Sequence, residues 1–325
     1  MKLRPTDPSQ PATAMSGRRR KRGVAMMAVF WLLAVLSLAV FVAVQVVFSD
    51  LGAINGQKKG FIALQRAEMG IAVGANPQVE EIDYELLHQQ FEDYSGFDVK
   101  LIGEGSRFNI NYILSTEDRD LLYNIFTYFG IDSELAEKLP VYMEDWIDVD
   151  DLRRVGSDGS EADYYEQELG ILGYPFNRPF YSVDEMLLVR DCSAIAAFSA
   201  RWRDFFTIYS GGRLDVNEAS AELIHLACEC DLEDAQDFVQ MRYGPDGEEN
   251  TEDDQRFQSA EEVMALLNVA FDRQEIVANR ITMNDTTTRI ESTGYIGDFK
   301  KRIMLVVRNR NNQPQILFRE EAPVY

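Results

Sequence analysis

The stretch RRRKRGVAMMAVFWLLAVLSLAVFVAVQVVF, residues 18–48, joins a basic block, one glycine and a long apolar run. Between residues 24 and 44 the only polar side chain is that of Ser37. A helix rises about 1.5 Å per residue, so this run roughly matches the ~30 Å hydrocarbon core of a bilayer. Because the basic block directly precedes it, the positive-inside rule predicts a cytoplasmic N-terminus and places everything after Phe48 across the membrane.

Three ordinary interpretations compete for this segment. A secretory signal peptide has an apolar stretch of about 7–15 residues and a small-residue cleavage site, whereas this run is longer and VFSD (residues 47–50) offers no such site. A buried core helix fails on length. An uncleaved signal anchor fits the physics and stays open as an alternative.

Gly23 suggests a more specific interpretation, because it ends the basic block on the cytoplasmic side of the apolar run. This arrangement resembles a class III, prepilin-type leader. The resemblance implies cleavage by a prepilin peptidase after Gly23, N-methylation of Val24 and retention of the apolar helix in the mature protein. Most of that superfamily carries Glu at the fifth mature position, where this chain has Ala28. The minor pseudopilin K of type II secretion systems is the member that lacks this Glu.

Composition narrows the class of protein and its partners. The 325 residues are 46% hydrophobic and 26% charged, which predicts globular structure of one large or two moderate domains. The formal net charge is −22, and residues 1–23 contribute +6 to it, so the remainder carries −28. This negative charge argues against nucleic acid as a binding partner and favours the binding of cations or basic surfaces. The chain has three cysteines and two histidines, and Cys228 and Cys230 are only two residues apart. These numbers and this spacing argue against a zinc site and against a histidine-based catalytic triad.

Periodicity predicts an α+β fold. The spacing of apolar residues continues the membrane helix to Asn76-Pro77, and a second helix is expected over residues 79–95. Residues 97–101 and 107–110 have the pattern of a β-hairpin. At the C-terminus, residues 287–295, 301–308 and 315–318 predict three antiparallel strands, which together with the hairpin would pack on the long helix.

The middle of the chain has helical periodicity. Residues 115–118 resemble an N-cap with an acidic first turn, and Asp132 and Asp231 begin helices expected to end at Trp146 and Met241. Residues 217–241 loosely echo residues 111–146, which suggests two helix-hairpin-helix-like units. Neither turn has the glycine pattern of DNA-binding units, so these helices are expected to serve packing. We therefore expect a large all-α insertion of the helix-hairpin-helix or SAM-like type.

Two acidic clusters are candidate cation sites. The first, GPDGEENTEDD (residues 244–254), joins turn formers to carboxylates and an amide, as calcium requires about six to eight oxygen ligands from a flexible loop. The candidate calcium ligands are Asp246, Asn250, Asp253 and Asp254, although the spacing is not that of an EF-hand. A solvated acidic turn remains the alternative.

The second cluster runs from Asp145 to Asp163. Its candidate ligands are Asp148, Asp150, Asp151 and Glu161, and a solvated loop remains the alternative. Paired carboxylates also serve glycosidases, but this cluster lacks an aromatic-rich sugar cleft, so no enzymatic activity is expected.

Motif blocks across the chain resemble, in order, those of pseudopilin K. They are RFNIN (107–111), WIDVDD (146–151) followed by Glu161 and Tyr164-Tyr165, NRPFYSVDE (177–185) and LDVNEA (214–219). The match departs near Glu161, where Ser160 offsets the expected small residue–Glu pair, and at Glu218, where the family often has Thr.

The resemblance implies a pseudopilin fold, in which a long N-terminal helix packs on an antiparallel sheet. The expected parts are a cytoplasmic leader (1–23), a transmembrane helix (24–48), the first α/β portion (49–114), the inserted helical domain (115–283) and the C-terminal sheet (284–325). It also implies a single-pass protein of the bacterial inner membrane whose C-terminal domain lies in the periplasm.

The implied role is non-enzymatic. With minor pseudopilins I and J the chain would form the tip of the pseudopilus and prime its assembly for protein export, with calcium as a structural ligand. The alternative is an uncleaved, signal-anchored periplasmic protein that binds or scaffolds a partner in the cell envelope.

Overall fold

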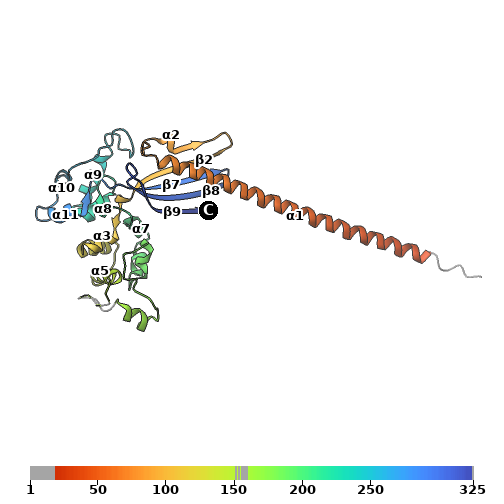
Figure 1. Ribbon diagram of the computed structural model, residues 1–325, viewed down its shortest axis with the longest axis horizontal. Coiled ribbons are helices and arrows are strands. Elements are labelled where there is room, and N and C mark those ends of the chain that lie inside the picture. Colours follow the sequence, from red (N-terminus) through yellow and green to blue (C-terminus); the bar gives the residue numbers. More distant parts are fainter. Residues whose placement is uncertain (1–18, 151, 153, 155–159, 324–325) are drawn as a thin grey trace, which may run out of the picture. The chain divides into compact units, whose positions relative to one another are not determined.

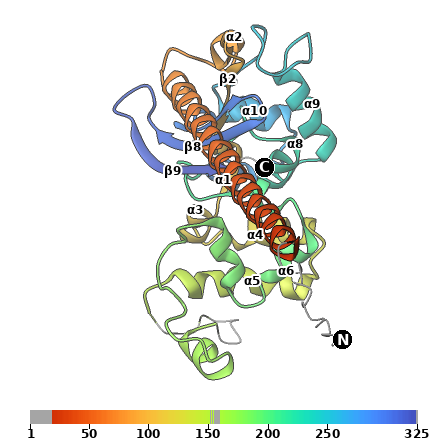
Figure 2. The same cartoon turned by 90° about the vertical axis from the view of Figure 1, so that its right-hand side faces the viewer.

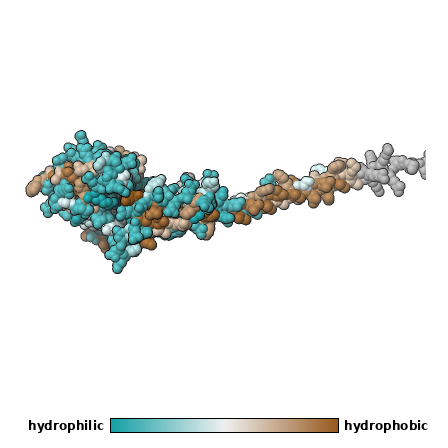
Figure 3. Space-filling model, turned by 90° about the horizontal axis from the view of Figure 1, so that it is seen from above, coloured by the Kyte–Doolittle hydropathy of each residue, from teal (hydrophilic) through white to brown (hydrophobic). Residues whose placement is uncertain are grey.

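The computed structural model describes residues 19–150, 152, 154 and 160–323. The long first helix, α1 (Arg19–Gly74), contributes to two compact units that divide between Lys59 and Gly60. In the first unit, α1 contains a segment long and apolar enough to cross a membrane, and its apolar side chains are exposed. Figure 3 shows this run as a nearly continuous brown surface along the helix. The expected apolar helix is therefore present as a candidate single-pass anchor.

The second unit contains a five-stranded antiparallel sheet with the order β1-β2-β7-β8-β9. Two strands come from before the helical segment and three from the C-terminal end. The strands are β1 (His88–Gln90), β2 (Ser95–Gly103), β7 (Thr287–Ile296), β8 (Phe299–Arg308) and β9 (Gln315–Pro323). The three C-terminal strands predicted from the sequence are thus confirmed.

The last turns of α1, residues 60–74, pack on one face of this sheet. Ala67 and Ile71 share a hydrophobic core with Phe97, Val99 and other buried strand residues. The approach is close because the central strand has Gly294 opposite the helix: a Cβ there would collide with the backbone of Ala63 and Ala67. Small residues on both elements therefore let the helix backbone lie directly on β7.

The chain leaves the sheet after β2 and returns to it at β7, and the segment between them is mainly helical. Figures 1 and 2 show α8, α9 and α10 in one group and α4, α5 and α6 in another. The helices are α3 (Ile110–Ser115), α4 (Arg119–Tyr128), α5 (Ser133–Ile147), α6 (Ser193–Phe198), α7 (Trp202–Phe205), α8 (Ala221–Cys228), α9 (Leu232–Arg242), α10 (Ala260–Leu266) and α11 (Gln274–Arg280). Short helical turns are η1 (Glu104–Ser106), η2 (Tyr164–Glu168) and η3 (Val183–Leu188).

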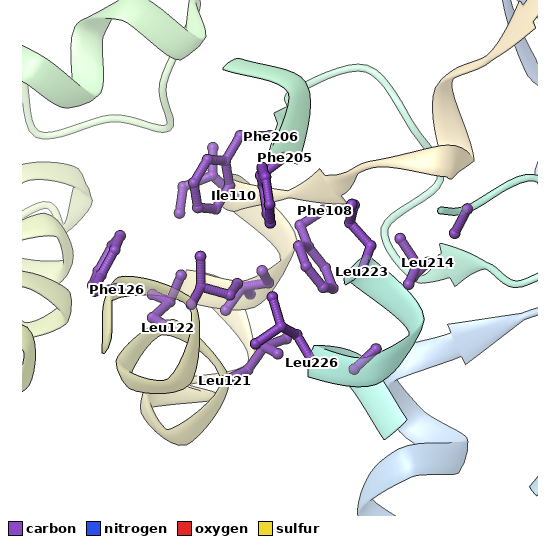
Figure 4. Close-up of a cluster of buried hydrophobic side chains, with 14 of the residues drawn as sticks. Phe108, Ile110, Leu121, Leu122, Phe126, Phe205, Phe206, Leu214, Leu223 and Leu226 are labelled. Atoms are coloured by element: carbon purple, nitrogen blue, oxygen red, sulfur yellow. The ribbon is translucent and has the colours of Figure 1, made fainter. Parts of the chain in front are cut away.

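This segment is not purely helical, because it also holds two short parallel strand pairs. The strands are β3 (Phe108–Asn109) with β4 (Phe206–Thr207), and β5 (Leu214–Asp215) with β6 (Ile281–Thr282). Both helix groups share one hydrophobic core. Figure 4 shows part of it, where Phe126 and Leu122 from α4 face Ile110 and Phe206. All three cysteines are buried and unpaired.

Two expectations were wrong. The helix expected over residues 79–95 is present only as α2 (Tyr84–Leu87), and the chain then enters β1. Val79 and Leu87 are nonetheless buried in the sheet core, so the spacing of these apolar residues indicated burial rather than a helix. The hairpin expected between residues 97–101 and 107–110 is instead formed by β1 and β2, and Phe108–Asn109 pairs in parallel with β4.

Candidate metal centre

The C-terminal end of α5 carries two of the acidic side chains of the second cluster. Asp132 caps the start of this helix through the amide of Glu134, as its position before the apolar stripe predicts. Asp145 and Asp148 are three residues apart, so they lie on the same face, one turn from each other. Trp146 lies between these two residues in the sequence. Its side chain is fully buried and anchors this end of the helix.

An aromatic cluster places the following segment against α5. The ring of Trp146 meets Tyr165, Tyr174 and Phe176 edge-on, with centroids 5.4, 5.0 and 5.3 Å away. The hydroxyl of Tyr165 also accepts a hydrogen bond from the Arg190 amide at 3.0 Å. This packing brings the start of the segment, including Glu161, to the acidic end of α5.

Asp145, Asp148 and Glu161 together form a candidate metal centre. Each offers a carboxylate oxygen, and these oxygens lie within 4.8 Å of one another. Among the residues that the structure describes, this is the one such group of acidic or other ligating side chains. Asp145 and Glu161 are buried, with 0% and 2% of their surface exposed.

The surroundings of these carboxylates are electrostatically mixed. The Asp145 carboxylate accepts hydrogen bonds from the Arg154 amide at 3.2 Å and the Ser160 hydroxyl at 3.0 Å. The Arg154 guanidinium pairs with Asp148 at 3.2 Å and also with Glu144 and Glu117. Burial raises the pKa of Asp148, with Asp150 and Asp145 adding to the effect, whereas Arg154 lowers it. The single positive charge of the Arg154 guanidinium therefore does not neutralise all the carboxylates around it.

The donor set fits a hard cation. Calcium binds oxygen ligands, commonly carboxylates supplemented by backbone carbonyls and water, at ~2.3–2.6 Å. In the described part of the chain, Asp148 Oδ1 is buried and receives no hydrogen bond. Three carboxylates within reach of one point supply the charge that such a site requires.

The structure brings together only part of the second predicted set. Asp148 and Glu161 belong to the group, but Asp150 is exposed and its carboxylate accepts a hydrogen bond from the Leu152 amide at 2.8 Å. Asp151 lies outside the described residues. Asp145, which was not among the predicted ligands, takes part instead. Its i, i+3 spacing from Asp148, the residue that caps the end of α5, is a sequence signal that could have pointed to it.

The loop after α9 uses its acidic side chains differently. The carboxylate of Asp253 accepts a hydrogen bond from the Asp246 amide at 3.2 Å, and that of Asp254 accepts one from the Asn250 amide at 2.8 Å. A hydrogen bond from Thr251 lowers the pKa of Asp253. These carboxylates satisfy turn amides, and the loop does not gather three of them around one point. Its role as a calcium site stays a prediction.

Gly23 and Val24 both lie within α1, in the first unit. Cleavage between them and methylation of Val24 stay predictions.

Sequence reasoning did not single out Glu218 as a titrating group. It follows β5 and packs against Gly103 at the end of β2, which has no room for a side chain there. Burial raises the pKa of Glu218 to about 7, reinforced by the charges of Asp215 and Glu81, while Arg256 at 3.7 Å lowers it. The sheet and the helical segment thus meet at a group of crowded carboxylates.

A buried ion pair joins the same two parts. Glu104, directly after β2, is 1% exposed and pairs with Arg107 at 2.6 Å and with Arg289 of β7 at 3.1 Å. It also accepts a hydrogen bond from the Thr207 hydroxyl on β4. These contacts fix the helical segment to the sheet.

Comparisons with known proteins point to one family. The family model described as type II secretion system protein K matches residues 106–205, which include the candidate metal centre. No curated protein matches the chain. A chain of the crystal structure of the GspK-GspI-GspJ complex from the type 2 secretion system of enterotoxigenic Escherichia coli shares the fold. The TM-score is 0.56 and the identity 11%, and the match covers 95% of this chain and all of that one. Residues 106–205 are thus similar to type II secretion system protein K, and the chain shares the fold of the solved chain.

Proposed function

We propose that this chain is the minor pseudopilin at the tip of the type II secretion pseudopilus, where it assembles with pseudopilins I and J to initiate the filament. The similar solved chain comes from a complex of pseudopilins K, I and J, which supports these two partners. The N-terminus would lie in the cytoplasm, the apolar part of α1 in the inner membrane and the second unit in the periplasm. The role is structural rather than enzymatic.

One observation carries the tip position: the apolar segment of α1 has Ala28 where other pseudopilins have Glu. A carboxylate in lipid is costly unless it is paired, and in these filaments its partner is the N-terminal amine of a neighbouring subunit. A subunit without this carboxylate cannot make that pairing. It can therefore occupy the position at which no further subunit lies beyond it.

Calcium is proposed as a structural ligand. Asp145, Asp148 and Glu161 would hold it at the junction of α5 and the segment that follows. A cation there would neutralise the carboxylate charge that Arg154 does not balance. It would also link α5 to the segment that follows it. The loop carrying Asp246, Asn250, Asp253 and Asp254 is a second candidate.

Co-assembly tests the partners directly. The full chain is produced with pseudopilins I and J of the same secretion system, solubilised in mild detergent and isolated through a tag on pseudopilin J. We expect a stable complex that contains all three proteins. An uncleaved signal-anchored scaffold protein would not enter this complex, so recovery of I and J without this chain would contradict the proposal.

A further inference from the structure

We propose that the guanidinium of Arg154 is a tethered cation that occupies the candidate metal centre when calcium is absent and yields its place when calcium binds. The inference rests on the calcium site of the proposed function and assigns to that site a residue that sets its affinity. It does not depend on the position of the subunit in the filament or on the membrane anchor.

Arg154 holds one oxygen of each of the two ligands on α5. Its guanidinium Nε donates a hydrogen bond to Asp148 Oδ2 at 3.2 Å, and its backbone amide donates one to Asp145 Oδ1, also at 3.2 Å. The other oxygen of Asp148, Oδ1, is buried and receives no hydrogen bond. Calcium takes about six to eight oxygen ligands and binds carboxylates through one or both oxygens. Arg154 therefore competes with it for the same atoms.

The charge of the guanidinium acts in opposite directions in the empty and the loaded site. Asp145 and Glu161 are 0% and 2% exposed, so the empty site needs a positive charge close to its carboxylates. A divalent cation that shares Asp148 with the guanidinium is repelled by it, and this repulsion is strong where the surroundings screen poorly. Arg154 therefore stabilises the empty site and weakens the binding of calcium.

Other carboxylates are already in place to hold the guanidinium when it leaves Asp148. Its Nη1 atom pairs with Glu117 Oε1 at 3.0 Å and with Glu144 Oε2 at 3.3 Å. Glu117 lies in the turn before α4 and has an exposed side chain, whereas Glu144 is buried and also pairs with Arg119. Because the contacts with Glu117 and Glu144 do not involve Asp148, the guanidinium gives up one ion pair and keeps the others.

A different role for Arg154 would be to orient the ligands, as hydrogen-bonding groups around metal sites do. An orienting residue stays in place when the metal binds, and its loss weakens the binding of the metal. A competing residue leaves when the metal binds, and its loss strengthens the binding. The full positive charge held directly on a ligand oxygen of Asp148 favours competition. The two roles therefore predict opposite effects of replacing Arg154.

Calorimetric titration of the full chain with calcium in mild detergent tests the competition. All chains carry Asp253→Asn and Asp254→Asn, which remove two candidate ligands of the loop after α9. Asp148→Asn in this background should abolish the remaining binding, so that the signal belongs to the candidate metal centre. We expect Arg154→Gln to bind calcium at least about tenfold more tightly, because a full positive charge is removed from a ligand.

Glu117→Gln supplies the test in the opposite direction. Without this carboxylate the guanidinium of Arg154 holds Asp148 more firmly, so calcium should bind several-fold more weakly. In a chain that also carries Arg154→Gln, the loss of Glu117 should have no further effect, because the two residues act through one contact. The side chain of Glu117 is 63% exposed, so this variant keeps the fold and decides the question on its own should Arg154→Gln fail to fold.

Two control variants separate the contact from a general effect of charge. Arg119→Gln removes a guanidinium that pairs with Glu144 and, among the described contacts, not with Asp148. Asp120→Asn removes an exposed negative charge three residues from Glu117. Both should leave the affinity for calcium within about threefold of that of the parent chain.

Equal or weaker calcium binding by the Arg154→Gln chain would overturn the proposal. So would an equal gain in the Arg119→Gln chain, or an equal loss in the Asp120→Asn chain, because either would show that any nearby charge has the same effect. Calcium binding with one affinity in the Arg154 and Glu117 variants would overturn this inference alone. An absence of calcium binding in all the chains would overturn the calcium site of the proposed function as well, so the two failures are distinguishable.

Discussion

Arg280 donates two hydrogen bonds to the carboxylate of Asp118, at 2.6 and 2.8 Å, across 162 residues of sequence. Asp118 caps α4 near the start of the helical segment, and Arg280 ends α11 just before the chain returns to the sheet. Arg280 is only 6% exposed and also pairs with Glu229 at 2.7 Å. This contact closes the helical segment on itself.

Replacing Arg280 with Met should therefore destabilise the second unit. The substitution leaves Asp118 and Glu229 without their buried partner, so we expect a loss of about 3 kcal/mol in the free energy of unfolding. Chemical denaturation of the detergent-solubilised chain measures it. Arg273→Met is the matched control, because Arg273 pairs with the same Glu229 but is about one-third exposed, and it should cost less than about 1 kcal/mol. Equal effects of the two substitutions would contradict the structural role of Arg280.

Gly294 should tolerate no larger residue. A Cβ at this position meets the backbone of Ala63 and Ala67, which cannot move aside as a flexible side chain would. Gly294→Val is expected to separate α1 from β7 and to lower the melting temperature by several degrees or prevent folding. Gly60→Ala provides the contrast, because nothing lies within 4 Å of the added atom, so helix propensity should make this variant as stable as the natural chain or more so.

Glu218 should make stability depend on pH. Its folded pKa is about 7, raised from 4.5, so the folded state binds more protons than the unfolded state between these values. The contribution of Glu218 to stability therefore falls as the pH rises through this window, by about 1–3 kcal/mol. Glu218→Gln should flatten the curve of unfolding free energy against pH, whereas Glu134→Gln, at an exposed position, should not. An unchanged slope in the Glu218 variant would show that this carboxyl titrates normally.

Calcium should stabilise the chain through Asp145, Asp148 and Glu161. Adding a chelator is expected to lower the melting temperature of the natural chain, because a cation bound only to the folded state raises stability by mass action. Asp148→Asn should abolish the shift, while Asp253→Asn should leave most of it if the second site is the weaker one. The reverse pattern would assign calcium to the loop after α9, and no shift in any variant would argue against a structural cation.

The sequence predicts the local features of this fold well. The apolar run of α1, its end before Asn76-Pro77, the helices that begin after Asp132 and Asp231, and the three C-terminal strands each depend on signals within a few residues. Capping side chains and apolar periodicity act at that range, and so do turn residues. These features were confirmed because no distant contact overrides them.

Pairing between distant segments was harder to predict. Residues 107–110 have the pattern of a strand, but their partner is Phe206–Thr207, nearly a hundred residues away. Residues 79–95 have helical spacing, yet His88–Gln90 is taken into the sheet by β2. The metal centre shows the same limit, because Glu161 reaches Asp145 and Asp148 only through the packing of Trp146 with Tyr165. Identifying the ligands required tertiary structure.

The mature N-terminus is the most direct test of the central claim, that this chain is a tip pseudopilin processed from a prepilin-type precursor. The chain is isolated from membranes of cells that contain the prepilin peptidase, and the mass of its N-terminal peptide is measured. A tip pseudopilin should begin at Val24, with a methylated amine, and the precursor should accumulate in cells that lack the peptidase. An intact Met1 in the membrane fraction of cells with the peptidase would contradict the account and favour the uncleaved signal anchor.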